Sequence, residues 1–218
     1  LIVEERLKGK PLAYLIGKKG FWKNDFIVTS DVLVPRPETE TLVDAILNEN
    51  LQGKTLLELG TGSGVISISI AQENKDCFIY ATDISIKSIL VAKQNAAKFY
   101  CENIIFLNHD WNNEWLFPQV DYLISNPPYV DKEATTGKEE GIWHEPEKAL
   151  FSKDKGLSDL KLILSKGKNF LNESGKVYLE HAPDQYEELN KFAMENGYLN
   201  FSNLNDLNGD KRVSIYQC

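Results

Sequence analysis

The sequence predicts a doubly wound α/β fold with a mostly parallel sheet, and two patterns lead to this expectation. Short apolar segments alternate with helical segments of about ten residues, as in successive βα units. Near the end of the chain, two strand-like segments follow one another without a helix, which predicts an antiparallel edge. The expected strands are 55–59, 78–82, 104–107, 121–124, 176–180, 198–202 and 212–216, and the expected helices are 64–72, 157–170, 184–195 and one beginning after Ser85.

The segments that precede this alternation have weaker patterns. Ser85 is a favoured N-cap residue, and we expect Ile86, Ile89 and Leu90 of its helix to face inward. No periodicity runs from 130 to 155, and a loop of that length in a compact domain is usually functional. Before residue 50 the expected elements are a helix at 1–8, a hairpin at 20–28 with its turn at 23–25, a short strand at 32–34 and a helix at 38–48.

Composition excludes several classes of protein. The chain has 218 residues, 42% of them hydrophobic, which suits one α/β domain with a small appendage. No run approaches the roughly 20 apolar residues of a membrane span, and no signal peptide is visible. Three scattered cysteines and three scattered histidines give no metal-ligand spacing and favour a reducing, cytoplasmic setting. A net charge of −8 disfavours direct binding of nucleic acid.

A glycine-rich turn follows the first strand of the alternation. It reads Gly60-Thr61-Gly62-Ser63-Gly64, Asp83 ends the second strand, and Asp110 with Trp111 ends the third. The carboxyl ends of parallel strands meet at one edge, where glycines admit a ligand and an acid can bind ribose hydroxyls. A polar side chain and an aromatic ring at the end of the third strand, here Asp110 and Trp111, can hold an adenine. We therefore expect an adenosine-bearing cofactor, the alternative being a turn whose acids only cap helices.

Two residues discriminate between adenosine cofactors. A dinucleotide motif needs a further glycine where this chain has Val65. Glu58, just before the glycines, disfavours a diphosphate and suits a cation. S-adenosylmethionine has a sulfonium and an amino group and no phosphate, so we expect it rather than NAD.

The fourth strand ends in Asn126-Pro127-Pro128-Tyr129. The side-chain oxygen of Asn126 and the carbonyl of Pro127 are two acceptors that suit the two hydrogens of a planar NH2 group. Tyr129 offers a flat surface to a planar substrate. This turn predicts methyl transfer to an amide or exocyclic amine nitrogen, achieved by positioning and electrostatics. The alternative is an ordinary proline turn at a strand end.

These motifs together resemble the HemK-type protein-(glutamine-N5) methyltransferases, which modify peptide chain release factors. Further stretches that match the family are 9–17, 32–40, 145–150 and 209–213. The resemblance implies a class I S-adenosylmethionine methyltransferase fold with a seven-stranded sheet. It also implies cofactor contacts at Gly60, Thr61, Gly62, Ser63, Gly64, Asp83, Trp111 and Asn126, and substrate contacts at Asn126, Pro127, Pro128 and Tyr129, of which Asn126, Pro127 and Tyr129 are expected to be catalytic.

The resemblance also implies a domain organisation. Residues 1–30 are expected to be the remnant of an N-terminal helical domain with a linker and hairpin, and 31–218 the catalytic domain. His181, where the family usually has glycine, is expected to be structural rather than a base. The roles of Arg36, Glu38, Trp143 and His144 stay open.

Three other functions compete with this expectation. The first is a nucleic-acid amino methyltransferase acting on adenine N6 or guanine N2, which the acidic charge disfavours. The second is a nicotinamide-dependent oxidoreductase, which Val65 and the Asn126–Tyr129 turn disfavour. The third is a non-catalytic cofactor-binding scaffold.

Overall fold

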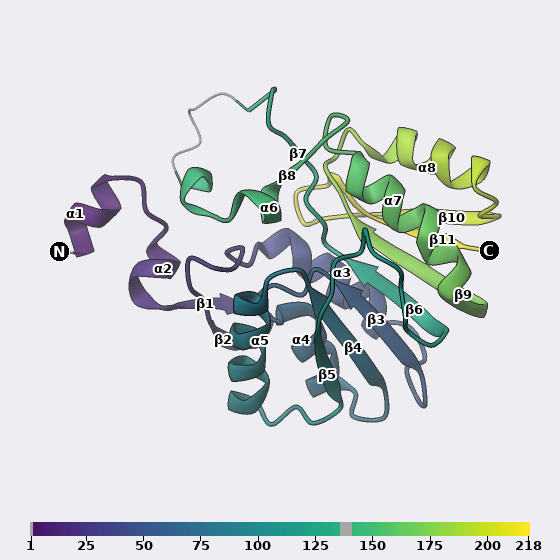
Figure 1. Ribbon diagram of the computed structural model, residues 1–218, viewed down its shortest axis with the longest axis horizontal. Helices are drawn as coiled ribbons and strands as arrows, with labels where there is room; N and C mark the ends of the chain where they lie inside the picture. Colours follow the sequence, from purple (N-terminus) through teal and green to yellow (C-terminus); the bar gives the residue numbers. More distant parts are fainter. Residues whose placement is uncertain (1, 136–140) are drawn as a thin grey trace.

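A computed structural model describes residues 2–135 and 141–218 of the chain, and its centre is one seven-stranded sheet (Figure 1). The strand order is β10-β11-β9-β6-β3-β4-β5, and β11 runs antiparallel to both of its neighbours. The predicted doubly wound, mostly parallel fold with an antiparallel edge is therefore confirmed. The strands are β3 (Thr55–Leu59), β4 (Phe78–Asp83), β5 (Ile104–Asn108), β6 (Val120–Ser125), β9 (Leu171–Glu180), β10 (Asn200–Asn205) and β11 (Lys211–Gln217).

Helices cover both faces of this sheet and create two hydrophobic cores. Side chains alternate across a strand, so Leu56 of β3 packs into one core while Leu57 and Leu59 pack into the other. The first core joins the sheet to α3, α4 and α5, and the second joins it to α7 and α8. The helices are α3 (Glu40–Leu47), α4 (Val65–Glu73), α5 (Ile86–Lys98), α7 (Ser158–Gly167) and α8 (Tyr186–Glu195).

The N-terminal elements lie to one side of the sheet, where α1 (Ile2–Leu7) and α2 (Leu12–Ile16) project outward (Figure 1). The hairpin of β1 (Lys18–Phe21) and β2 (Asn24–Ile27) packs inward instead, because Phe21 and Phe26 are buried in the first core. Its turn lies at Trp22 and Lys23, one step earlier than expected. The backbone of Trp22 has φ 53°, which the sequence pattern does not reveal.

Two local expectations are wrong. Residues 32–34 form no strand, because no strand in the described part of the chain pairs with them and the backbone N–H of Val34 donates to the side chain of Glu145 instead. In α5, Ser85 does cap the helix by accepting from the N–H of Ser88, and Ile89 is buried. Ile86 and Leu90 are more than half exposed, because the inward face of α5 passes through Ile89 and Ala92.

The segment without periodicity contains short elements that cross the end of the sheet. They are β7 (Val130–Asp131), η2 (Ile142–His144), α6 (Glu147–Leu150) and β8 (Phe151–Ser152), with β7 and β8 paired in parallel. Part of the predicted loop, 136–140, falls outside the described residues. The helix predicted at 157–170 ends in a separate 3-10 turn, η3 (Lys168–Phe170).

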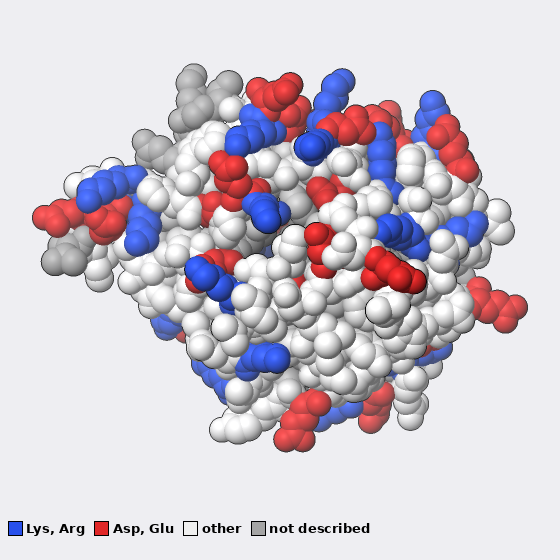
Figure 2. Space-filling model, in the orientation of Figure 1, with Lys and Arg blue, Asp and Glu red and all other residues white. Residues whose placement is uncertain are grey.

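Charged side chains of both signs lie intermingled on the face shown in Figure 2. Within 2–135 and 141–218, no cluster of three His, Cys, Asp or Glu side chains is arranged to hold a metal ion. Over the same residues, every helix is too short or too polar to cross a bilayer.

Candidate active site

Five of the eight expected cofactor residues meet at a cavity of about 460 Å³ at the carboxyl ends of the parallel strands, which we name the main cavity. Its volume lies within the roughly 300–1,000 Å³ of typical small-molecule sites. The five lining residues that the sequence nominated for the cofactor are Gly60, Gly62, Asp83, Trp111 and Asn126. Pro128 joins them, and the opposite walls come from 30–33 and 146–149.

The glycine turn brings backbone to the cavity wall. Gly60 and Gly62 have φ values of 76° and 56°, in the left-handed region that glycine tolerates best. The N–H groups of Gly60 and Thr61 both donate to the carbonyl of Thr82, which ties the turn to β4. A Cβ atom on Gly60 would lie 3.2 Å from the ring of Trp111, whereas one on Gly62 would meet nothing within 4 Å. Gly62 is therefore the open point of the turn.

The other residues of the turn face away from the cavity. Thr61 and Ser63 are buried, and the carbonyl of Ser63 accepts from the side-chain amide of Asn95. A Cβ atom on Gly64 would lie 2.8 Å from Ile68 Cδ1, so this glycine permits close packing of the turn on α4. These three positions stabilise the turn, and none of them lines the main cavity.

Glu58 is buried beneath the turn rather than in the cavity wall. Its Oε2 accepts from Thr61 Oγ1 at 2.7 Å and also from the hydroxyl of Ser67. Its Oε1 has no hydrogen-bond partner in the described part of the chain. Burial raises the pKa of Glu58 to about 7, because the charged form is poorly solvated there. Its hydrogen bonds lower that pKa, and the charge of Asp83 adds a smaller upward effect.

Asp83 is held in place by backbone at the mouth of the turn. Its Oδ2 accepts from the N–H of Gly62 at 2.9 Å, and its Oδ1 accepts from the N–H of Ser85 at 2.8 Å. A carboxylate has about four acceptor sites, so two N–H groups leave capacity for two hydroxyl groups. Burial raises the pKa of Asp83, and the two N–H groups oppose that rise.

Trp111 provides a flat wall beside Gly60. Its indole Nε1 donates to Asp159 Oδ1 at 3.0 Å, which fixes the plane of the ring. Asp110 points elsewhere: its Oδ1 accepts from the backbone and the side chain of Asn112. Of the expected acid–aromatic pair, the ring of Trp111 lines the main cavity, whereas the carboxylate of Asp110 is bound to Asn112 in the loop that follows β5.

The Asn126–Tyr129 turn separates the main cavity from a neighbouring one of about 170 Å³, which we name the side cavity. Asn126 lines both cavities, while Pro127 and Tyr129 line the side cavity. Asn126 Nδ2 donates to Thr39 Oγ1 at 3.0 Å, and the hydroxyl of Tyr129 donates to Glu180 Oε1 at 3.0 Å. Burial and the charge of Glu180 raise the pKa of Tyr129 far above its ordinary value.

Sequence reasoning did not nominate Thr39 and Glu180 for the site. Both are buried, and both contact side chains of the Asn126–Tyr129 turn. Thr39 belongs to a stretch matched by the family resemblance, yet its neighbouring acids and prolines are also those of an ordinary helix start. Glu180 ends a strand more than fifty residues after Asn126, so only the folded sheet brings them together.

The stretches around 36 and 145, whose roles the sequence left open, are joined by an ion pair. Arg36 Nη2 donates to Glu145 Oε1 at 2.5 Å, and Glu145 Oε2 accepts from the N–H of Val34 at 2.9 Å. Two aromatic groups secure the same segment: Trp143 packs on Phe151, and His144 Nε2 lies 3.0 Å from the carbonyl of Lys8. Arg36 also lines the side cavity.

His181 is fully buried near the end of β9. Its Nδ1 lies 2.8 Å from the carbonyl of Ala182, and its Nε2 lies 2.7 Å from the hydroxyl of Ser214. Burial lowers the pKa of His181, because the imidazolium is poorly solvated there. With both ring nitrogens engaged outside the main and side cavities, the geometry agrees with a structural role.

The main cavity fits S-adenosylmethionine on two observations. Asp83 keeps free acceptor capacity beside the open Gly62, which suits ribose hydroxyls. Among the described residues, the charged side chains that line the cavity are three acids, Asp31, Asp83 and Glu147, and one base, Lys148. This balance favours a cationic ligand over a diphosphate. When bound, S-adenosylmethionine supplies an electrophilic methyl group on its sulfonium.

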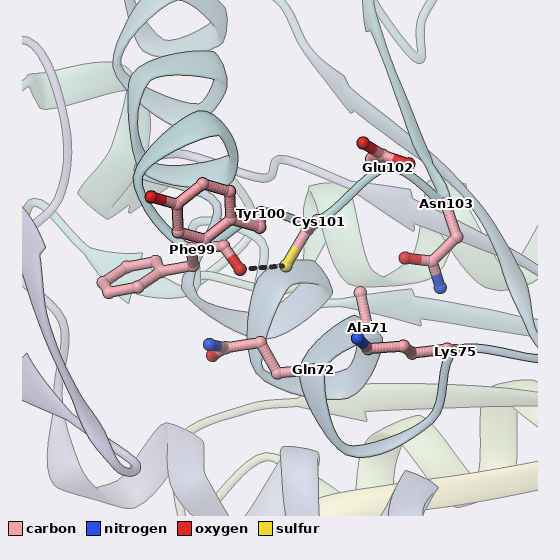
Figure 3. Close-up of a pocket in the computed structure, with 8 residues that line it drawn as sticks. All are labelled: Ala71, Gln72, Lys75, Phe99, Tyr100, Cys101, Glu102 and Asn103. Atoms are coloured by element: carbon pink, nitrogen blue, oxygen red, sulfur yellow. Dashed lines mark hydrogen bonds between the residues drawn. The ribbon is translucent and has the colours of Figure 1, made fainter.

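A second cavity of comparable size, about 380 Å³, shares no lining residue with the main cavity. Figure 3 shows the residues that line it. It is formed where α4 and α5 end, by residues that include Gln72, Lys75, Tyr100 and Glu102. Cys101 faces it with its thiol turned toward the carbonyl of Phe99, and burial raises the pKa of that thiol. None of the predicted site residues lies there.

The fold and the main cavity define the class of the protein, which is an S-adenosylmethionine-dependent methyltransferase. Residues 37–156 match the family model of the methyltransferase small domain. A solved methyltransferase from Pyrococcus furiosus has a similar fold, with a TM-score of 0.68 and 19% identity over 99% of this chain and 96% of that one. The magnesium protoporphyrin IX methyltransferase of Synechocystis, solved with bound S-adenosylmethionine, shares the fold at a TM-score of 0.55 and 18% identity over 82% of this chain and 76% of that one.

The particular family follows from closer relatives. The release factor glutamine methyltransferase of Coxiella burnetii is 38% identical over 98% of this chain and 77% of its own length. That of Francisella tularensis is 37% identical over 97% of this chain and 75% of its own length. The chain belongs to the release factor glutamine methyltransferase family.

Proposed function

We propose that the protein transfers a methyl group from S-adenosylmethionine to the side-chain amide nitrogen (N5) of a glutamine in the Gly-Gly-Gln motif of peptide chain release factors. The observation that carries the proposal is the position of Asn126, which lines both the main cavity and the side cavity. A methyl donor in the first and an amide in the second meet at that residue. The names of the relatives support release factors as the protein substrate.

The residues of the turn suit an amide nitrogen, which is a poor nucleophile because its lone pair is delocalised. The Nδ2 group of Asn126 is bound to Thr39, so its side-chain oxygen is free to accept a hydrogen from the substrate NH2. The carbonyl of Pro127 is the proposed second acceptor. Two acceptors hold the nitrogen in line with the methyl group and stabilise the positive charge that builds on it.

The remaining assignments follow from this proposal. Asn126, Pro127 and Tyr129 are the catalytic residues, and Pro128 with these three holds the substrate. The other cofactor contacts are Gly60 and Gly62 of the glycine turn, Asp83 and Trp111, while Thr61, Ser63 and Gly64 hold the turn in shape. Residues 1–30 form the appendage and 31–218 the catalytic domain. The protein acts in the cytoplasm and binds no nucleic acid directly, which agrees with its net charge of −8.

The proposal is tested by mass spectrometry of a release factor incubated with the protein and S-adenosylmethionine. We expect one added methyl group, located on the glutamine of the Gly-Gly-Gln motif. A release factor with glutamate at that position lacks the amide and serves as the control, and it should stay unmodified. Methylation of DNA or ribosomal RNA, with none of the release factor, would show that the nucleic-acid alternative is right.

A further inference from the structure

Three polar side chains, Asn126, Thr39 and Glu180, form a row that begins in the Asn126–Tyr129 turn and ends at a fully buried carboxyl group. Asn126 Nδ2 donates to Thr39 Oγ1, and Thr39 lies next to the carboxylate of Glu180 at the end of β9. Glu180 is fully buried, and its Oε1 accepts from the hydroxyl of Tyr129. Its Oε2 has no hydrogen-bond partner of good geometry in the described part of the chain. The hydroxyl of Thr39 lies within hydrogen-bonding reach of this carboxyl group and lowers the pKa of Glu180.

The hydrogen-bonding capacity of these groups fixes the direction of the row. An ionised carboxylate only accepts, so it draws the single hydrogen of the Thr39 hydroxyl toward Glu180. The oxygen of Thr39 is then left to accept, and the group of Asn126 that faces it must be the Nδ2 donor. A flipped amide would either set Asn126 Oδ1 against the oxygen of Thr39 or draw the hydroxyl hydrogen of Thr39 away from the buried carboxylate, and each arrangement is costly.

We propose that Thr39 and Glu180 are positioning residues that act through Asn126, holding its amide so that Oδ1 faces the substrate nitrogen. This inference rests on the proposed function, because it assigns Asn126 the role of acceptor for that nitrogen. The same carboxylate anchors Tyr129, so one buried group orients both polar side chains of the turn.

The row also makes turnover depend on the ionisation of Glu180. Burial raises the pKa of this carboxyl to about 7, and Thr39, Tyr129 and Arg212 oppose that rise. Glu38 adds a smaller upward effect. Below this pKa the carboxyl carries its own hydrogen, the hydroxyl of Thr39 is released, and Asn126 loses its fixed orientation. Turnover should therefore rise as the pH passes upward through about 7.

Substitutions at Thr39 test the row with the intact chain. Thr39→Val keeps the shape and removes the hydroxyl. At saturating substrates we expect kcat to fall about 10- to 100-fold, less than the ~10²–10³-fold typical of losing a preorganised group itself, because Asn126 is still present. Thr39→Ser restores the hydroxyl and should return kcat to within about threefold of the wild type, allowing for the lost methyl group. Thr41→Val, two residues further on in the first turn of α3, is the matched control, since its hydroxyl has no hydrogen bond within 2–135 and 141–218.

Two further measurements separate positioning from mere structural support. In NMR spectra, the side-chain NH2 protons of Asn126, identified by their loss in Asn126→Ala, should exchange slowly with solvent in the wild type and faster in Thr39→Val. In Glu180→Gln, the rise of kcat with pH near 7 should disappear, because glutamine does not ionise there.

The outcomes distinguish this inference from the proposed function. If the wild-type protein left the release-factor glutamine unmodified, the proposed function would be refuted. The solvent exchange of the Asn126 NH2 protons in the wild type and in Thr39→Val would still show whether Thr39 holds the Asn126 amide. Thr39→Val with wild-type kcat, or with unchanged proton exchange, would overturn the positioning role. Loss of kcat in Thr41→Val to the same extent would also overturn it, since damage to the helix would then explain the effect.

Discussion

Asp83 accepts hydrogen bonds from the backbone N–H groups of Gly62 and Ser85, so its carboxylate has a fixed direction before a ligand binds. Asn126 is held in a similar way by Thr39. The two residues lie in the same cavity but have different tasks in the proposed reaction. Asp83 would bind a part of the cofactor that does not react, whereas Asn126 would face the nitrogen where charge develops. Their substitutions should therefore affect different kinetic constants.

For Asp83→Ala, we expect weaker cofactor binding with largely preserved turnover. Hydrogen bonds to a charged group are worth about 1.5–3 kcal/mol, so the dissociation constant of S-adenosylmethionine should rise about tenfold or more. At saturating cofactor kcat should partly recover, because this interaction is similar in the ground and transition states. Calorimetry gives the affinity. Asp76→Ala is the control, because Asp76 is an exposed acid just before β4, at the opposite end of that strand from Asp83. An unchanged affinity for S-adenosylmethionine in Asp83→Ala would show that Asp83 does not bind the cofactor.

For Asn126→Ala, we expect the reverse. Loss of one preorganised acceptor should lower kcat about 10²–10³-fold at saturation, with a smaller loss of cofactor affinity than in Asp83→Ala. Asn126→Asp keeps an acceptor toward the substrate and should retain more activity than the alanine variant. Initial rates on the same release factor decide between these outcomes. Near-wild-type turnover of Asn126→Ala would show that the turn has another role.

Among the elements, the segment from η2 to α6 depends most on long-range contacts. Residues 146–149 form one wall of the main cavity, and Glu145 fastens that wall to Arg36 and to the backbone of Val34. The segment has few buried side chains of its own, so this ion pair and its second hydrogen bond carry much of its attachment. Segments held by few contacts open more readily than a core does.

We therefore expect Glu145→Ala to release the cavity wall without unfolding the domain. The backbone amides of 142–150 should exchange faster with solvent, and cofactor affinity should fall about tenfold, in line with a lost charge-assisted bond. Glu145→Gln can still accept from Val34 and should be intermediate. Hydrogen-exchange mass spectrometry measures the effect, with the exposed Glu133→Ala as control. Equal exchange of these amides in the wild type, Glu145→Ala and Glu145→Gln would show that the segment is held by other contacts.

At the scale of the whole molecule, the two cores lie against a sheet that also buries two acids, Glu58 and Glu180. Burial raises the pKa of each to about 7, above the ordinary value of 4.5. Between these values the folded state binds more protons than the unfolded state, so each acid makes unfolding easier as the pH rises. Both acids therefore lower the unfolding free energy near neutral pH, and both bind turns that line the cavities: Glu58 binds Thr61 of the glycine turn and Glu180 binds Tyr129.

Glu58→Gln isolates this effect, because glutamine cannot lose a proton. Between pH 5 and pH 8, the unfolding free energy of the wild type should fall by about 1–3 kcal/mol more than that of Glu58→Gln. The contribution of Glu58 is present below the unfolded pKa of about 4.5 and is lost as the pH rises through about 7. Urea unfolding at several pH values measures it, with Glu133→Gln as control. Parallel curves for wild type and Glu58→Gln would contradict the raised pKa.

The amino-acid sequence by itself determined the doubly wound fold, the glycine turn and the Asn126–Tyr129 turn. These features are local: the alternation of apolar segments sets the elements, and each motif is read from a few adjacent residues at a strand end. The same local reading failed at Ile86 and Leu90, because the inward face of a helix depends on what packs against it. It failed at 32–34 because a strand needs a partner.

Only the tertiary structure decided which polar groups support the site. Asp110 and Trp111 are adjacent in sequence, yet the ring lines the main cavity while the acid binds its own loop. Glu145 and Arg36 are separated by 109 positions, and Asn126 and Thr39 by 87. Such pairs leave no periodic signal, because a hydrogen bond depends on distance and direction in space rather than on spacing along the chain. The physical reason is the parallel sheet, which gathers the ends of distant strands at one edge.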